Sequence, residues 1–143
     1  MTQVDFYSLP DKDPEARILL TCRLLEKSLA KNHRVLIQVN DQDDAEQLSE
    51  KIWGFRPESF LAHGFLNAHP KNEIEIGWTE EHGTQQDILI QLSNDIPDFF
   101  SRFDRVIEIT CDTPTIIDRS RDHFRYYKER GYSLNHHKLK ALL

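Results

Sequence analysis

The sequence has few glycines, and their spacing excludes the common phosphate-binding loops. None of the 5 Gly in 143 residues falls in a G-x-G-x-x-G or G-x-x-x-x-G-K-[ST] pattern. The first turn that could hold a nucleotide reads SLPDKDP, with two prolines that lack amide hydrogens and two aspartates that would repel phosphate. We therefore expect no nucleotide-binding loop.

Cysteine is also scarce, and no hydrophobic run is long enough to cross a bilayer. The two cysteines, Cys22 and Cys111, lie in apolar surroundings and do not form a close pair. The N-terminal stretch MTQVDFYSL lacks the basic and then apolar regions of a secretion signal. We expect a reduced, cytoplasmic protein that has no membrane partner.

Catalytic and metal-binding motifs are missing from the sequence as well. The seven histidines include no pair spaced i, i+4, neither cysteine has zinc-finger spacing, and there is no G-x-S-x-G elbow. His136 and His137 are adjacent, so most backbones would point them to opposite sides. We expect a non-catalytic protein with no metal and no cofactor.

What the sequence does contain is an uneven distribution of charge. Residues 1–118 carry 11 Lys and Arg against 22 Asp and Glu, a net −11, whereas residues 119–143 carry 7 against 2, a net +5. An acidic body disfavours wide contact with DNA, because a nucleic acid needs many cations to displace its counterions. A small cationic patch is better suited to a short acidic ligand.

Hydrophobic periodicity predicts a single α/β domain over residues 1–143, because strand and helix patterns alternate and alternation favours parallel pairing with right-handed crossovers. Residues 54–72 have no clear period and are expected to form a long connection. Gly83 lies between two strand patterns and is expected in a hairpin turn. The expected strands are 4–9, 34–39, 73–78, 87–92 and 105–110, and the expected helices are 13–32, 41–53, 97–103 and 113–130.

The last predicted helix carries a cationic stripe. Arg121, Arg125 and Lys128 are spaced i, i+4, i+7, which places them within about 60° of one another around the helix. Phe124 and Tyr127 lie beside the stripe, and residues 116, 117 and 120 complete an inward face. Two interpretations stay open: a binding site, or two core aromatics next to a solvated face near a helix end.

A second cluster brings four large aromatics into thirteen residues, at Trp53, Phe55, Phe60 and Phe65. Core packing would use one or two of them. Because a connection runs over the surface, some of the four are expected to form an exposed contact patch.

Several sequence blocks stand in a distinctive order and spacing: FYSL from Phe6, RVLIQVND from Arg34, Trp53 followed by ESFLAH, EIGW from Glu75, DILIQL from Asp87 and RDHFRYYKERGYSLN from Arg121. In these blocks the chain resembles the chi subunit family of bacterial DNA polymerase III holoenzyme. The resemblance implies a three-layer, Rossmann-like α/β domain that has a mostly parallel central sheet and no nucleotide-binding loop. It also implies an accessory subunit of DNA replication.

The resemblance implies two protein partners and contact with DNA only through them. Chi-like proteins bind the small psi subunit as a 1:1 heterodimer, which ties them to the clamp loader. They also bind the acidic C-terminal tail of single-stranded DNA-binding protein, and in some relatives a helicase-like repair protein competes with psi.

Site residues follow from the same resemblance. Trp53, Phe60 and His63 match the psi-facing side. Ile117 replaces a lysine that a relative carries, so one cation of the tail site is missing here. The tail-binding side matches Arg121, Phe124, Arg125, Tyr127, Lys128, Gly131 and Leu134.

A rival interpretation is direct binding of single-stranded nucleic acid. Phe124, Tyr126 and Tyr132 would then be stacking platforms, and the cationic stripe would follow the phosphates. Binding to an oligonucleotide alone distinguishes the two, because only the rival predicts it.

Overall fold

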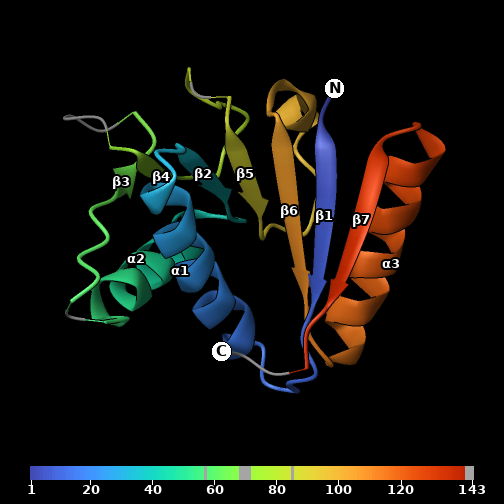
Figure 1. Ribbon diagram of the computed structural model, residues 1–143, viewed down its shortest axis with the longest axis horizontal. Coiled ribbons are helices and arrows are strands. Elements are labelled where there is room, and N and C mark those ends of the chain that lie inside the picture. The colour runs from blue at the N-terminus through green and yellow to red at the C-terminus, as the bar shows by residue number, and fades with distance from the viewer. Residues whose placement is uncertain (57, 68–71, 85, 141–143) are drawn as a thin grey trace.

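A computed structural model of the chain describes residues 1–56, 58–67, 72–84 and 86–140 (Figure 1). Strands and helices alternate along most of the chain, as the sequence predicts. In chain order they are β1 (Gln3–Ser8), α1 (Glu15–Ala30), β2 (Val35–Gln38), α2 (Gln42–Gly54), β3 (Gly64–Phe65), β4 (Ile74–Gly77), β5 (Ile88–Gln91), the 3₁₀ helix η1 (Asp98–Arg102), β6 (Arg105–Thr110), α3 (Pro114–Glu129) and β7 (Ser133–Lys138).

In the described part of the chain, the strands form one seven-stranded sheet of order β3-β4-β2-β5-β6-β1-β7. Every pairing in it is parallel. The predicted α/β fold is confirmed, and the sheet is wholly rather than mostly parallel. Figure 1 shows α1 and α2 over the half of the sheet that contains β4, β2 and β5, with α3 beside β7 at the other end.

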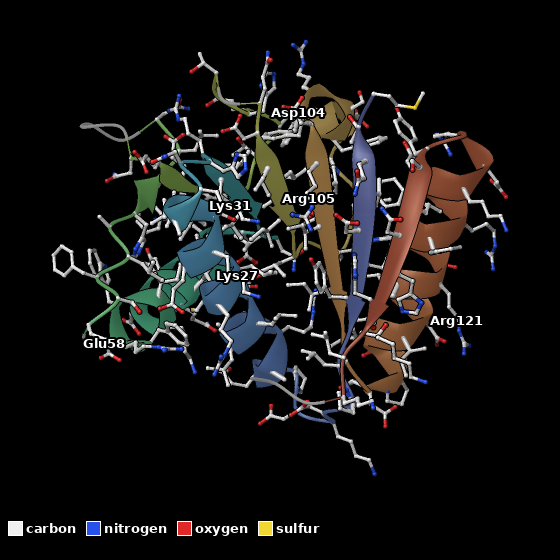
Figure 2. All side chains as sticks on the ribbon, in the orientation of Figure 1. Lys27, Lys31, Glu58, Asp104, Arg105 and Arg121 are labelled. Carbon is white, nitrogen blue, oxygen red and sulfur yellow. The ribbon has the colours of Figure 1, made fainter. Side chains whose placement is uncertain are left out.

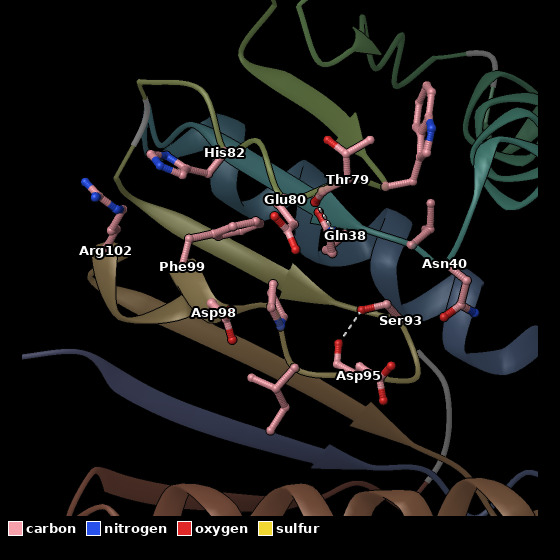
Figure 3. Close-up of a pocket in the computed structure, with 14 residues that line it drawn as sticks. Gln38, Asn40, Thr79, Glu80, His82, Ser93, Asp95, Asp98, Phe99 and Arg102 are labelled. Carbon is pink, nitrogen blue, oxygen red and sulfur yellow. Dashed lines mark hydrogen bonds between the residues drawn. The ribbon is translucent and has the colours of Figure 1, made fainter.

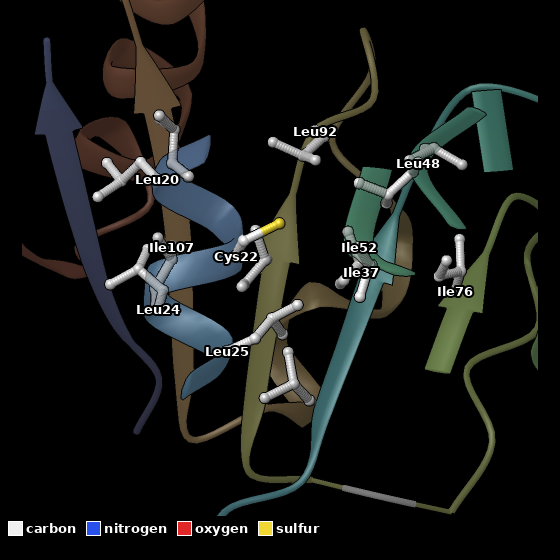
Figure 4. Packing of buried hydrophobic residues seen from close by; sticks show 14 of the residues in the cluster. Leu20, Cys22, Leu24, Leu25, Ile37, Leu48, Ile52, Ile76, Leu92 and Ile107 are labelled. Atoms are coloured by element: carbon white, nitrogen blue, oxygen red, sulfur yellow. The ribbon is translucent and has the colours of Figure 1, made fainter. Parts of the chain in front are cut away.

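Helices on both faces explain why the central strands are apolar on both sides. Along β2, Val35 and Ile37 pack into a core cluster with α1 and α2, whereas Leu36 between them packs into a second cluster with Phe100 and Tyr127. Figure 4 shows the first cluster, in which Leu20, Leu24 and Leu25 of α1 reach the sheet. Two cores on one sheet give the three layers.

Cysteine 22 lies in the first core, as its apolar surroundings predict. Burial raises the pKa of its thiol to about 12, so the group stays protonated at neutral pH. Both Cys22 and Cys111 are free.

The helix boundaries agree closely with the sequence signals. Asp41 caps α2 by accepting a hydrogen bond from the amide of Asp44 at 2.8 Å. At the start of α1, whose N-cap is Pro14, Asp13 accepts a hydrogen bond from the amide of Glu15 at 2.9 Å. Thr113 precedes Pro114 at the start of α3, but its hydroxyl donates to the carbonyl of Lys12 instead of capping the helix.

The predicted hairpin between residues 73–78 and 87–92 is wrong. β4 and β5 both pair with β2, which lies between them, and both run parallel to it. Gly83 does adopt a left-handed conformation, with φ of 66°, but it lies in a crossover loop. Turn composition alone does not distinguish such a loop from a hairpin, because both need left-handed residues.

Two strands, β3 and β7, were not predicted from the sequence. β3 is only two residues long and falls inside the predicted connection. β7 follows α3 and pairs with β1 in register Val4–Leu134 and Phe6–His136. Its sequence, SLNHHK, is polar because β7 is an edge strand whose side chains are mostly exposed.

A buried polar network fixes α3 to β6. Nδ1 of His123 lies 3.1 Å from both carboxylate oxygens of Glu108, and Nε2 lies 2.8 Å from the carbonyl oxygen of Asn94. Both partners only accept, so both hydrogen bonds form only when the ring is doubly protonated. The hydroxyl of Tyr127 donates to the same carboxylate at 2.7 Å.

The network raises the pKa of His123. Burial lowers the pKa of His123, but the hydrogen bond and charge of Glu108 outweigh burial, so the pKa lies above its ordinary value of 6.5. The stabilisation is therefore complete below pH 6.5 and is lost as the pH rises through the folded-state pKa.

We expect His123→Gln to remove this pH dependence. The difference in unfolding free energy between the wild type and the variant should be largest near about pH 6 and should shrink towards about pH 9. Urea unfolding at several pH values measures it. His82→Gln, at a half-buried histidine with no ion pair among the described residues, is the control. A difference that stays constant with pH would contradict the charged state inferred for His123.

Candidate functional site

A groove of about 540 Å³ runs between α3, the end of β1 and β7. Its floor contains Phe6, Leu9 and Ile117, and Phe124 closes one side with its ring edge-on to Phe6 at 5.3 Å. Two cations, Arg121 of α3 and Lys138 of β7, rim the groove. The groove therefore combines an apolar pocket with positive charge.

The cationic stripe lies on the solvent side of α3, as its spacing predicts. Arg121, Arg125 and Lys128 are all exposed, and Figure 2 shows Arg121 on α3 near β7. Arg121 borders the groove. Arg125 forms an exposed ion pair with Asp122 at 3.5 Å, which is worth little and would open readily for a ligand.

The three remaining predicted tail-site residues lie in different environments: the core, the end of a helix and an edge strand. Tyr127 is fully buried beneath α3, so its side chain supports the site from the core. Gly131 ends the helix with φ of 79°, which favours glycine. Leu134 is half-buried on β7 and packs against the second core.

Two groove residues come from the strand that sequence reasoning missed. His136 and Lys138 lie on β7, and Nε2 of His136 is 2.6 Å from the hydroxyl oxygen of Ser8. Lys138 brings a cation to the same groove that the apolar Ile117 lines. The stop at Gly131, followed by Tyr132 and Leu134, was the available signal for another strand.

The rings invoked by the nucleic-acid interpretation are already engaged. The guanidinium carbon of Arg130 lies 3.5 Å from the ring centroid of Tyr126, over the face of the ring. Tyr132 packs against Phe100 with ring centroids 5.1 Å apart. Phe124 is half-buried against Phe6. These contacts leave little open stacking surface.

A separate aromatic surface lies at the C-terminal end of α2. Trp53 is 53% exposed and Phe60 is 76% exposed, and their ring centroids are 6.2 Å apart. His63 lies beneath Trp53 at 4.5 Å, and its Nε2 is 2.8 Å from the hydroxyl of Ser49. Of the four aromatics predicted in this region, these two are exposed, whereas Phe55 and Phe65 pack on the core. The predicted psi-site residues therefore come together.

The backbone at Phe60 supports a functional interpretation of this surface. Its φ is 44°, in the left-handed region that residues other than glycine rarely adopt. Such strain is typically retained where a function requires it. Here it presents a phenyl ring to solvent.

The place where open α/β sheets commonly bind ligands, at the carboxyl ends of the strands, also holds a cavity. It measures about 610 Å³ and lies where β2, β4 and β5 end (Figure 3). Glu80, Asp95 and Asp98 line it, and these carboxylates disfavour a phosphate. The geometry agrees with the missing phosphate loops.

The described residues, 1–56, 58–67, 72–84 and 86–140, contain neither a metal-ligand cluster nor a membrane-spanning helix. No group of three or more potential metal ligands is found among them. No helix among them is both long and apolar enough to cross a bilayer. His69, one of the seven histidines, lies outside the described residues.

The chain is thus an α/β protein with a groove beside α3 and an exposed aromatic surface at the end of α2. Comparison with known proteins is consistent with this. A family model described as DNA polymerase III chi subunit, HolC, matches residues 1–135. The chain is 37% identical over 142 residues to DNA polymerase III subunit chi of Pseudomonas aeruginosa, which covers 99% of this chain and 100% of the relative.

More distant relatives carry the same name. DNA polymerase III subunit chi of Escherichia coli is 28% identical, covering 81% of each chain, and that of Haemophilus influenzae is 26% identical, covering 81% of this chain and 83% of the relative. The chain belongs to the DNA polymerase III chi subunit family, whose members are accessory subunits of DNA replication.

The exposed aromatics should contribute little to folding. We expect Phe60→Ala to change the free energy of unfolding by less than about 0.5 kcal/mol, as at other surface positions. Phe100→Ala, at a position only 4% exposed, should lower it by roughly 3–5 kcal/mol. Urea titration compares the two variants. Equal losses would show that Phe60 belongs to the core.

Proposed function

We propose that the protein bridges the clamp loader, through psi, to the C-terminal tail of single-stranded DNA-binding protein. The observation that carries the proposal is the groove beside α3, in which an apolar floor meets Arg121 and Lys138. Membership of the chi family supports it. The tail ends in acidic residues, a small apolar stretch and a terminal phenylalanine carboxylate, and each part has a counterpart in the groove.

The phenyl ring of the tail would enter between Phe6, Ile117 and Phe124. Burying such a ring gives roughly 1.5–3 kcal/mol. Arg121 would receive the terminal carboxylate, with directional specificity from a paired hydrogen bond. The ring supplies most of the affinity, and the carboxylate fixes its orientation.

The acidic residues of the tail would lie along Arg125 and Lys128. Exposed ion pairs contribute about 0.2–1 kcal/mol each. Association entropy consumes part of the total, so affinity near the micromolar range, about −8 kcal/mol, is expected. Lys138 would supply the positive charge that is missing because Ile117 replaces a lysine.

The aromatic surface of Trp53 and Phe60 would bind psi. An exposed pair of large rings is the usual anchor of a protein interface, because burying them releases much apolar area. A helicase-like repair protein that competes with psi would use the same rings.

The two surfaces lie far apart in the strand order. The aromatic surface adjoins α2 and β3 at one edge of the sheet, whereas the groove adjoins β1 and β7 at the other. Both partners can therefore bind at once, which bridging requires.

Tail binding should depend on the stripe. We expect Arg121→Ala to weaken binding of a tail peptide about tenfold, through loss of a charged hydrogen bond of roughly 1.5 kcal/mol. Arg125→Ala, which removes an exposed ion pair, should weaken it by up to about fivefold. Calorimetry measures the affinity, and Arg102→Ala, at an exposed arginine outside the groove, serves as the control. Unchanged affinity in both stripe variants would reject the assignment. Tight, salt-sensitive binding of an oligonucleotide alone would favour the nucleic-acid interpretation.

Psi binding should depend on the exposed aromatics. We expect Phe60→Ala to abolish co-purification with psi while the tail peptide still binds. Leu19→Ala, at a large hydrophobic residue on α1 that is 39% exposed, is the matched control and should retain psi. Loss of both partners in Phe60→Ala would indicate a folding defect, and retention of psi would reject the surface.

A further inference from the structure

The face of the sheet that α1 and α2 share is only partly covered. Figure 1 shows no helix in front of β1 and β7 on this face. A groove of about 480 Å³ lies there, between α1 and the strands β6 and β1. Leu20, Leu24, Ile107 and Leu139 line it with aliphatic surface.

Helix α1 gives this groove a row of cations. Arg23, Lys27 and Lys31 are spaced i, i+4, i+8, so they follow one side of the helix over about 12 Å. None of the three has an ion-pair partner among the described residues. Glu26 is the carboxylate of the lining, and Arg56 and Ser59 already occupy it.

A fourth cation comes from the sheet. Arg105 of β6 lines the same groove, where Asp5 and the hydroxyl of Tyr7 hold its guanidinium. Burial raises the pKa of the Asp5 carboxyl, but the hydrogen bond and charge of Arg105 outweigh burial and lower it, so Asp5 stays ionised. The guanidinium is thereby fixed before any ligand arrives.

Helix electrostatics alone do not account for this arrangement. Cations in the last turn of α1 are stabilised by the helix dipole, which explains Lys27 and Lys31. Arg23 lies two turns earlier, and Arg105 belongs to another element. Three helix cations without ion-pair partners among the described residues converge with a strand arginine held by Asp5, in a protein of net charge −6, and this indicates an anionic ligand. Figure 2 shows Lys27, Lys31 and Arg105 on this face.

We propose that the groove between α1 and β6–β1 binds an acidic peptide segment of a partner protein. Along about 12 Å it accommodates three or four extended residues, with aspartate or glutamate on the cations and an aliphatic side chain on the leucine floor. The inference is independent of the tail groove, which lies on the opposite face of the sheet beside α3.

The lining favours a peptide over single-stranded nucleic acid. Bases need open aromatic faces, and Tyr7, the one Tyr, Phe or Trp among the described residues of the lining, is already stacked on His137 with ring centroids 4.6 Å apart. The floor is otherwise aliphatic. The net negative charge of the rest of the protein also disfavours binding of nucleic acid.

The test uses a capped peptide, Asp-Leu-Asp-Leu-Asp, that has no phenylalanine and no free carboxyl terminus. We expect it to shift the backbone amide resonances of Tyr7, Leu24 and Ile107 in NMR titration, and not those around Phe124. The capped peptide Asn-Leu-Asn-Leu-Asn should shift none of them. Added salt should weaken binding, because the attraction is electrostatic.

Matched variants locate the site. Lys27→Gln combined with Lys31→Gln should weaken binding of the acidic peptide about tenfold, with thermal unfolding used to confirm an intact fold. Lys128→Gln should leave this peptide unaffected and weaken the phenylalanine-ended tail peptide instead. The two grooves are thereby tested separately.

Three results would overturn the inference: no shifts with the acidic peptide, equal weakening by Lys128→Gln, or shifts around Phe124 alone. If a thymidine hexanucleotide shifts the groove residues and the acidic peptide does not, the groove binds nucleic acid and the peptide assignment fails.

Discussion

A buried carboxylate that must be compensated determines how one side of the molecule is built. Glu108 lies in the middle of β6, 3% exposed, where an unpaired charge would be strongly destabilising. α3 supplies both partners, His123 and Tyr127, one turn apart. Because these two side chains must face inward, the residues about a quarter turn or more away must face outward. The cationic stripe and the wall formed by Phe124 are thus consequences of how Glu108 is satisfied.

Much of the fold follows from local sequence signals. Apolar runs such as those at Val35 and Ile88 read as strands because both faces of a parallel sheet are covered, and the Asp41 cap and Pro114 mark helix starts. The order in which the strands pair does not follow from local sequence signals. The strand that inserts between β4 and β5 comes from residues 35–38, far away in the chain, and no turn residue encodes that choice.

The two candidate surfaces could be located from the sequence to the extent that they lie on helices or expose large rings. Helical spacing places Arg121 and Lys128 without any knowledge of the sheet, and an aromatic cluster on a connection indicates Phe60. The place of Lys138 in the groove was not predicted, because a polar edge strand has no hydrophobic period to detect. For Tyr127 the sequence left a core position and a binding position open, because its partner, Glu108, lies on a different element and is polar itself.

The position of β1 in the sheet has a consequence for synthesis of the protein. β1 is made first, yet its two neighbours are β6, residues 105–110, and β7, residues 133–138. On the ribosome, residues 3–8 therefore have no strand to pair with until more than a hundred further residues have emerged. β2, β4 and β5 can assemble with α1 and α2 well before then. Until then the nascent chain carries a strand without its partners, and closure of the sheet by β1 is a late event in folding.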